Sequence, residues 1–157
     1  MYKRIAVAVD GSPTSSAGLH EAVKLATDQQ ARLLLIHIVE EPIAMMTPEA
    51  GYYVSEMIDA MQVSGKAIVE KALAFAKKSG VPTETVMPES FSTNAADHIL
   101  KEAKKWRAEL IVVGTHGRRG LRRIVLGSDA EQIVRSSPVP VLLVRAREIT
   151  PRTRRST

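Results

Sequence analysis

Short runs of apolar residues recur along the chain and are separated by stretches with helical periodicity. Four of the runs cover residues 5–9, 33–39, 110–113 and 141–144, and each is continuous and rich in branched side chains. Such runs are typical of strands that are buried on both faces of a parallel sheet. A weaker fifth run covers residues 83–87. The pattern therefore predicts five strands.

The stretches between these runs predict helices at roughly 13–29, 53–79, 92–106 and 128–136. The alternation of strand and helix predicts an α/β fold, an open and doubly wound sheet of mostly parallel strands with helices on both faces. The longest helical stretch carries apolar residues at helical spacing, which predict an ordinary core-facing surface. These residues are Val54, Met57, Ile58, Met61, Ile68 and Ala72.

Length and composition indicate one domain. The chain has 157 residues, of which 45% are apolar and 25% charged, and this balance is typical of a single domain with a buried core. We expect the domain to span 1–147 and a basic, disordered tail to follow at 148–157, where no apolar anchor occurs. The amino-terminal residues lead directly into a strand pattern without signal-peptide features, so a cytoplasmic protein without membrane contact is expected.

The net charge of +5 is concentrated in two segments. Residues 118–123 contain four arginines, and residues 145–157 contain five arginines against one glutamate. Nucleic-acid-binding domains usually spread basic residues over a face and add aromatic ones, but aromatic residues make up only 4% of this chain. A nucleic-acid partner is therefore not expected. The chain has no cysteine, which excludes disulfides, thiolate metal sites and cysteine nucleophiles.

A glycine-punctuated segment follows the fourth apolar run. Gly114-Thr-His-Gly117 comes directly after that run, and Gly127-Ser128 opens the last predicted helix. A strand, a glycine-rich loop and a helix in this order can direct backbone N–H groups at an anion. The segment is not a Walker loop, because no lysine precedes Ser128. The first strand-to-helix turn contains the single Gly11, which excludes the dinucleotide-binding fingerprint of Rossmann dehydrogenases.

Asp10 stands at the end of the first strand. Ser12 and Pro13 have the residue types of a helix cap and a first helical position, so Ser12 is predicted to cap the helix and Asp10 to remain free. Ligands of doubly wound sheets bind at the carboxyl ends of the strands, where the strand order reverses. If the first and fourth strands are neighbours, Asp10 and Gly114 flank one crevice.

These residues resemble the ATP-binding branch of the universal stress protein family. The resemblance covers about residues 3–145 and rests on the spaced glycines and Ser128, with support from the strand ends at 7–12 and 37–39. It implies a Rossmann-like sheet ordered 3-2-1-4-5, with an adenine nucleotide between strands one and four. The implied contacts are Ala8, Val9 and Asp10 beside the adenine and ribose, the Ile38 backbone at the adenine edge, and Val113, Gly114, Gly117, Gly127 and Ser128 around the ribose and phosphates.

The resemblance also implies partners. ATP with Mg or Mn is the expected ligand, with ADP or AMP as alternatives, and Asp10 is a candidate for a water-mediated contact to the nucleotide-bound metal. No protein-only metal site is expected. The family suggests a homodimer, or a tetramer, paired through the last strand at 141–144, and a regulatory protein partner whose identity the sequence does not give. An apolar strand at the edge of a sheet favours such pairing.

Several site residues have a competing interpretation. Ser128-Asp-Ala-Glu131 has the pattern of a capping box, so Ser128 could cap the last helix, and a capping hydroxyl can still donate its own proton to a phosphate. Asp10 could be an ordinary turn residue. Arg118 is the best placed of four neighbouring arginines to reach a phosphate, although a solvated arginine run is an equal alternative. Asp129 stands where the family usually has an uncharged residue, and its carboxylate would repel a phosphate unless a metal or arginine intervened.

Catalytic signals are sparse. The four histidines show no metal-binding spacing, and no nucleophile elbow occurs. The leading hypothesis is therefore an ATP-binding stress-response or regulatory protein, in which the nucleotide orders the loop at 115–127 and changes a surface for partners. One alternative is a nucleotide-blind dimeric interaction protein of the same fold. A second is a slow ATP hydrolase or an adenylating enzyme.

Overall fold

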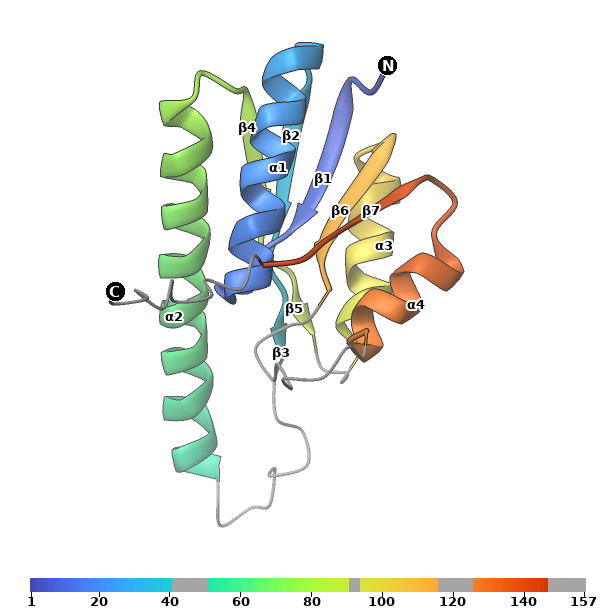
Figure 1. Ribbon diagram of the computed structural model, residues 1–157. Helices are drawn as coiled ribbons and strands as arrows, with labels where there is room; N and C mark the ends of the chain where they lie inside the picture. Colours follow the sequence, from blue (N-terminus) through green and yellow to red (C-terminus); the bar gives the residue numbers. More distant parts are fainter. Residues whose placement is uncertain (41–50, 91–93, 116–125, 147–157) are drawn as a thin grey trace, which may run out of the picture.

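The computed structural model of the chain describes residues 1–40, 51–90, 94–115 and 126–146 (Figure 1). Five strands form one sheet in which every neighbouring pair is parallel. In spatial order they are β4 (Thr83–Val86), β2 (Arg32–Ile36), β1 (Arg4–Ala8), β6 (Leu110–Gly114) and β7 (Val141–Val144). Counted along the chain, this is the order 3-2-1-4-5 that the resemblance implied, and the predicted fold is confirmed.

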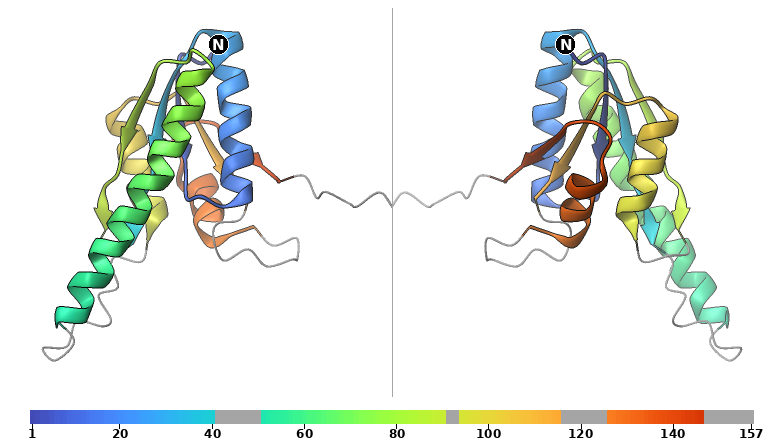
Figure 2. Two further views of the ribbon diagram at one scale, coloured as in Figure 1. Left: turned by 90° about the vertical axis from the view of Figure 1, so that its left-hand side faces the viewer. Right: turned by 90° about the vertical axis from the view of Figure 1, so that its right-hand side faces the viewer.

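Helices cover both faces of this sheet (Figures 1 and 2). On one face lie α1 (Pro13–Gln29) and α2 (Gly51–Lys78), and on the other α3 (Ala95–Lys105) and α4 (Ser128–Ser136). Successive side chains of a strand point to opposite faces, so each strand contributes to two cores. Ile5 and Val7 pack beneath α1 and α2, whereas Ala6 packs beneath α3 and α4.

A second, two-stranded sheet was not predicted. It pairs β3 (Val39–Glu40) with β5 (Glu89–Ser90) in parallel. Residues 33–39 were expected to form one strand, but β2 ends at Ile36 and β3 begins three residues later, at Val39. Apolar residues continue on both sides of this break, and the one polar residue of the run, His37, lies at the break itself.

The predicted core face of α2 is only partly correct. In the carboxyl-terminal half of the helix, Val69, Ala72 and Ala76 are buried. In the amino-terminal half, the described members of the predicted face are only half-buried, and Val63 is 67% exposed. Figures 1 and 2 show why: this half of α2 extends beyond the end of the sheet. Helical periodicity identified the apolar face of the helix but not the length of sheet beneath it.

Glu109, which immediately precedes β6, connects the amino ends of the neighbouring strands β1 and β6. One carboxylate oxygen of Glu109 accepts a hydrogen bond from the Lys3 N–H at 2.7 Å, and the other forms an ion pair with Arg4 at 2.8 Å. The backbone N–H of Lys3 and the positive charge of Arg4 both favour the ionised carboxylate, so the pKa of Glu109 is lowered. These contacts join the start of β1 to the start of β6.

The lowered pKa predicts a pH dependence of stability. Ionised Glu109 stabilises the fold above its unfolded pKa of about 4.3, and this contribution disappears as the pH falls through the lower pKa of the folded state. Glu109→Gln should therefore unfold at a lower urea concentration than wild type at pH 7, and the difference should shrink at pH 3. Glu70→Gln, on the exposed surface of α2, is the control and should change the midpoint little at either pH.

Candidate functional site

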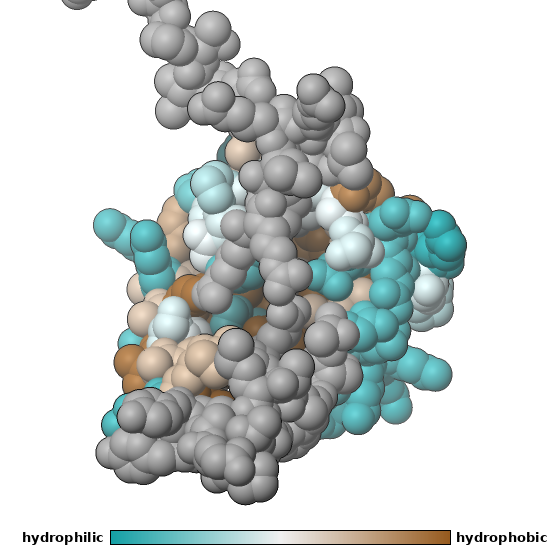
Figure 3. Space-filling model, turned by 90° about the horizontal axis from the view of Figure 1, so that it is seen from below, coloured by the Kyte–Doolittle hydropathy of each residue, from teal (hydrophilic) through white to brown (hydrophobic). Residues whose placement is uncertain are grey.

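The carboxyl ends of β1 and β6 lie side by side where the strand order of the sheet reverses. Ile5, Ala6 and Val7 of β1 pair in register with residues 110–112 of β6. Figure 3 views the molecule from the end at which these strands finish. In doubly wound sheets this position is the usual ligand-binding crevice. The first and fourth strands of the sheet are therefore neighbours, as a crevice flanked by Asp10 and Gly114 requires.

The turn between β1 and α1 corrects the expectation for Asp10. Asp10 is not free, since its Oδ1 accepts a hydrogen bond from the Ser12 N–H at 2.8 Å. Its own N–H donates to the Ser15 hydroxyl at 3.0 Å. The Ser12 side chain accepts from the Ser15 N–H at 3.1 Å and caps α1 as predicted. In turns, an aspartate side chain frequently accepts a hydrogen bond from the backbone N–H two residues further along. The expectation that Asp10 is free did not take this bond into account.

Side chains of the β1–α1 turn accept hydrogen bonds from backbone N–H groups at and just before the start of α1. The N–H groups of Asp10, Ser12 and Ser15 all donate to side chains of the same turn. Pro13 has no N–H. The first helix therefore offers few backbone donors to a phosphate, unlike the helix that follows the first strand in Rossmann dinucleotide-binding domains.

Gly114 brings β6 into direct contact with α1. A Cβ atom at this position would lie 2.7 Å from the Thr14 carbonyl carbon and 2.8 Å from the Ser15 nitrogen, both of them backbone atoms. Only glycine permits this approach. Gly114 thus permits the close packing of the end of β6 against the start of α1, a role that is independent of any ligand and was not predicted.

The start of α4 lies beside the end of β6. The Gly127 N–H donates to the Thr115 carbonyl at 2.9 Å, and the Thr115 N–H donates to Val144 at 2.9 Å. Helix α4 has Gly127 as its N-cap residue and no side-chain cap hydrogen bond. The capping-box interpretation of Ser128 is therefore wrong, because Ser128 is already inside the helix. Its exposed side chain is not used to cap the backbone.

The adenine-side residues of the resemblance gather at the ends of β1 and β2. Ala8 closes β1, Val9 is buried, and the Val9 N–H donates to the Ile36 carbonyl at 2.9 Å. Ile38 is half-buried against the α3 and α4 core. His37 was quoted only as part of a strand pattern, yet it is 5% exposed and its Nδ1 lies 2.7 Å from the Val9 carbonyl oxygen. His37 could have been identified from the sequence, because it is a polar residue inside an apolar run.

Other predicted features fall outside this geometry. Gly117 and Arg118 lie outside the described residues, as do the tail at 148–157 and most of the loop at 115–127. Val113 is buried in β6, and Asp129 lies in the first turn of α4 with Glu131. Within the described ranges no group of histidine, aspartate and glutamate side chains could hold a metal ion. The helices in these ranges include none long and apolar enough to cross a membrane.

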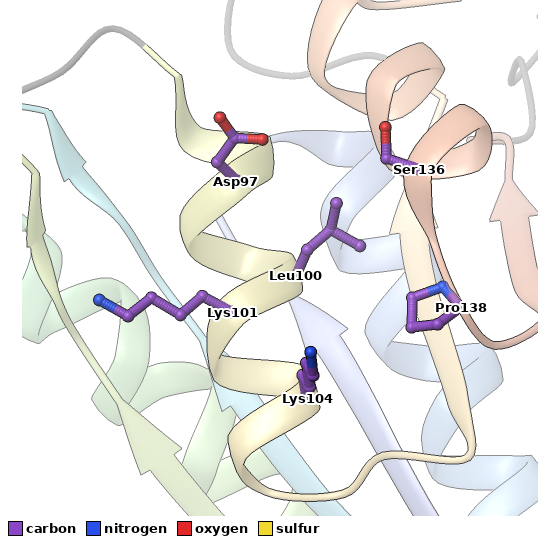
Figure 4. Close-up of a pocket in the computed structure, with 6 residues that line it drawn as sticks. All are labelled: Asp97, Leu100, Lys101, Lys104, Ser136 and Pro138. Carbon is purple, nitrogen blue, oxygen red and sulfur yellow. The ribbon is translucent and has the colours of Figure 1, made fainter.

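A separate hollow of about 430 Å³ lies between α3 and α4 (Figure 4). Asp97 stands at its rim and accepts a hydrogen bond from the Gln132 side chain at 2.8 Å, which links the two helices. Leu100 and Pro138 supply apolar surface, and the remaining lining residues are Lys101, Lys104 and Ser136. None of these residues belongs to the predicted site, so the hollow is distinct from the crevice between β1 and β6.

Comparison with known proteins agrees with the motif. The model of the universal stress protein family matches residues 1–145. The chain belongs to the universal stress protein family. It is 34% identical to universal stress protein YxiE of Bacillus subtilis over 151 residues, which cover 92% of this chain and 100% of the relative. It also matches the solved structure of universal stress protein UspA from Lactobacillus plantarum with a TM-score of 0.81 and 28% identity, covering 92% and 98% of the two chains.

Three solved structures of similar fold contain adenine nucleotides. A universal stress protein in complex with cAMP has a TM-score of 0.68 and 24% identity. The protein of Archaeoglobus fulgidus in complex with dAMP has a TM-score of 0.67 and 21% identity, and that of Arabidopsis thaliana with AMP bound has 0.68 and 19%. Each covers more than 90% of this chain. At these identities the likeness establishes the shared fold.

The close approach at Gly114 predicts the effect of adding one methyl group. Gly114→Ala forces its Cβ against backbone atoms of α1, and we expect a loss of about 1–3 kcal/mol in unfolding free energy. Gly18→Ala is the matched control, because its Cβ would meet atoms of β6 no closer than 3.7 Å. That variant should gain up to about 1 kcal/mol from helix propensity. Equal effects of the two substitutions in urea unfolding would contradict the assignment.

Proposed function

We propose that this universal stress protein binds an adenine nucleotide in the crevice between β1 and β6, and that occupancy changes the loop at 115–127 and the surface offered to a protein partner. ATP with Mg or Mn is the first candidate ligand, and ADP and AMP are the alternatives. The adenine nucleotides bound by three structural neighbours support the ligand class. Family membership supports a role in the stress response.

The single observation that carries the proposal is the difference between the two helix starts at the crevice. In α1 the Ser12 side chain caps the Ser15 N–H and Pro13 has no N–H, whereas α4 begins at Ser128 without a side-chain cap. The first N–H groups of a helix and its dipole favour an anion. The phosphates are therefore assigned to α4 and the preceding loop, where Gly127 and Ser128 lie, together with Gly117 and Arg118 of the family pattern.

The base is assigned to the other end of the crevice. Ile38 follows β2, and adenine carries an acceptor nitrogen, N1, beside a donor amino group on its pairing edge. A backbone N–H and C=O of one residue can match that pair. Val9 and Ala8 supply the adjoining surface, and Asp10 is the candidate for the ribose or for a water on the nucleotide-bound metal.

Asp129 favours the alternative of a nucleotide-blind interaction protein. Its carboxylate lies in the first turn of α4, where it favours the helix dipole but repels a phosphate. Calorimetry with AMP, ADP and ATP in the presence of Mg distinguishes the nucleotide-binding function from that of a nucleotide-blind interaction protein. Saturable binding supports the nucleotide function, whereas no binding at millimolar nucleotide supports the interaction protein. Turnover of bound ATP would be needed for the second alternative, an ATP hydrolase or adenylating enzyme.

Removal of the Asp129 charge tests the electrostatic part of the proposal. Asp129→Asn should raise the affinity for ATP by about twofold to fivefold and that for AMP by less, since a charge at a helix terminus is worth about 0.3–1 kcal/mol. The gain should decrease at high salt. Glu131→Gln removes the same charge from the same helix, but from a side chain paired with Arg135 at 2.6 Å. An equal gain in that control would contradict the assignment of Asp129.

The edge strand β7 is the proposed dimer surface. Leu142 and Leu143 are 36% and 37% exposed, and β7 pairs only with β6 within the described chain. An apolar edge strand is a template for pairing with a second copy. The same edge could serve a dimer or one step of a tetramer.

A lysine on this edge should block the pairing. Leu142→Lys is expected to convert a dimer to a monomer at micromolar concentration, measured by light scattering after gel filtration. Val63→Lys is the control, because it replaces another exposed apolar residue, on α2. An unchanged mass in Leu142→Lys, or a monomeric wild type, would contradict the dimer through β7.

A further inference from the structure

The hydrogen-bond ladder between β1 and β2 ends in an unusual way. Alternate residues bond across a parallel pair, and the Val9 N–H donates to the Ile36 carbonyl at 2.9 Å as this pattern requires. In a regular continuation, the Val9 carbonyl would next accept the N–H of Ile38. It accepts a side chain instead. The His37 Nδ1 lies 2.7 Å from the Val9 oxygen.

The chemistry of this contact fixes the proton. A carbonyl oxygen can only accept a hydrogen bond, so the Nδ1 of His37 carries the proton and donates it. His37 is 5% exposed, and a buried hydrogen bond costs more to lose than an exposed one. The imidazole therefore takes the position on Val9 that a strand neighbour would otherwise occupy.

The group that His37 displaces from the Val9 carbonyl is the backbone N–H of Ile38. On the other side of β2, the His37 N–H donates to Val86 at 3.1 Å and the Val39 N–H donates to Pro88 at 3.3 Å. Because successive N–H groups of a strand point to opposite sides, the Ile38 N–H between them is directed toward β1. Among the residues that the structure describes, it has no hydrogen-bond partner.

Helix α2 is shaped to accept the imidazole. A Cβ on Gly65 would lie 2.9 Å from the His37 Nε2 and 3.2 Å from the Met87 Sδ. Glycine is unfavourable inside a helix, so its presence in the middle of α2 has a steric explanation here. The helix backbone, Met87 and the Val9 carbonyl together hold the ring in one orientation.

We propose that His37 is a positioning residue for adenine recognition: it ends the β1–β2 ladder by occupying the Val9 carbonyl and so reserves the Ile38 N–H for the acceptor N1 of adenine. The inference rests on the proposed nucleotide function and adds a determinant of base specificity to it. Guanine and hypoxanthine carry a hydrogen on N1 and would place a donor against this N–H. The site therefore selects adenine through a residue that does not touch the base.

Two substitutions of His37 separate positioning from packing. His37→Asn keeps an N–H donor at the same number of bonds from the backbone as Nδ1, whereas His37→Leu fills the space without a donor. In His37→Leu the Val9 carbonyl is left to accept the Ile38 N–H, which closes the ladder. The probes are AMP and 1-deaza-AMP, which lacks the N1 acceptor, and the readout is the ratio of their dissociation constants by calorimetry.

The expected ratios are distinct. Wild type and His37→Asn should bind AMP about fivefold to tenfold more tightly than 1-deaza-AMP, as one hydrogen bond to the base predicts. His37→Leu should bind the two probes within about a factor of two of each other. A Leu variant that loses affinity for both probes equally, and so keeps the wild-type ratio, would overturn the proposal and leave His37 a packing residue. So would a wild type that does not distinguish the probes.

Amide hydrogen exchange tests the ladder without nucleotide. In wild-type protein the Ile38 N–H should exchange much faster than that of Ile36, and in His37→Leu it should become protected. Slow exchange in wild type would overturn the inference even if AMP binds. If wild type binds no AMP while Ile38 exchanges fast, the proposed function and the adenine part of the inference fail together, and the ladder end at His37 stands as structure alone.

Discussion

The need to satisfy backbone polar groups where parallel strands end governs this site. Each strand of the sheet finishes with N–H and C=O groups that no neighbouring strand can bond, and an unpaired buried group is costly. The chain solves this differently at each strand end. The β1–α1 turn uses Asp10, Ser12 and Ser15, the Val9 carbonyl uses His37, and the end of β6 uses Gly127 and Val144. Within the described part of the chain, two places at the strand ends keep backbone groups without such a bond: the Ile38 N–H and the uncapped start of α4. A ligand can form hydrogen bonds there.

This distribution explains why a nucleotide site can lie beyond β6 although the fold resembles dinucleotide-binding domains. In the latter, the glycine-rich turn after the first strand exposes the N–H groups of the first helix to a pyrophosphate. Here Ser12 caps that helix and Pro13 removes another donor. A phosphate at α1 would have to displace bonds that are already made. At the start of α4 a phosphate would not have to displace a side-chain cap, because that helix has no side-chain cap hydrogen bond.

The sequence allowed much of the fold to be predicted, because buried parallel strands are continuous apolar runs and helices are periodic. The strand at 141–144 and the helices beginning at Pro13 and Ser128 were placed correctly. The break after Ile36 and the protruding half of α2 were missed, because both depend on where another element stops. Asp10 was predicted free because capping was assigned to Ser12 alone, whereas the turn uses both side chains at once. The nucleotide-binding roles of the site residues all remain predictions, and Gly117 and Arg118 also lie outside the described residues.

Gly114 and Gly65 show how far the same residue type can differ in meaning. Gly114 belongs to a recognisable motif, yet its measurable constraint is the backbone of α1 only 2.7 Å from an added Cβ. Gly65 belongs to no motif and would be judged a weak point of a long helix, yet an added Cβ there would lie 2.9 Å from the imidazole that controls the end of β2. Both act by absence of a side chain rather than by backbone flexibility. Gly114 allows the end of β6 to approach the start of α1, and Gly65 leaves room on α2 for the imidazole at the end of β2.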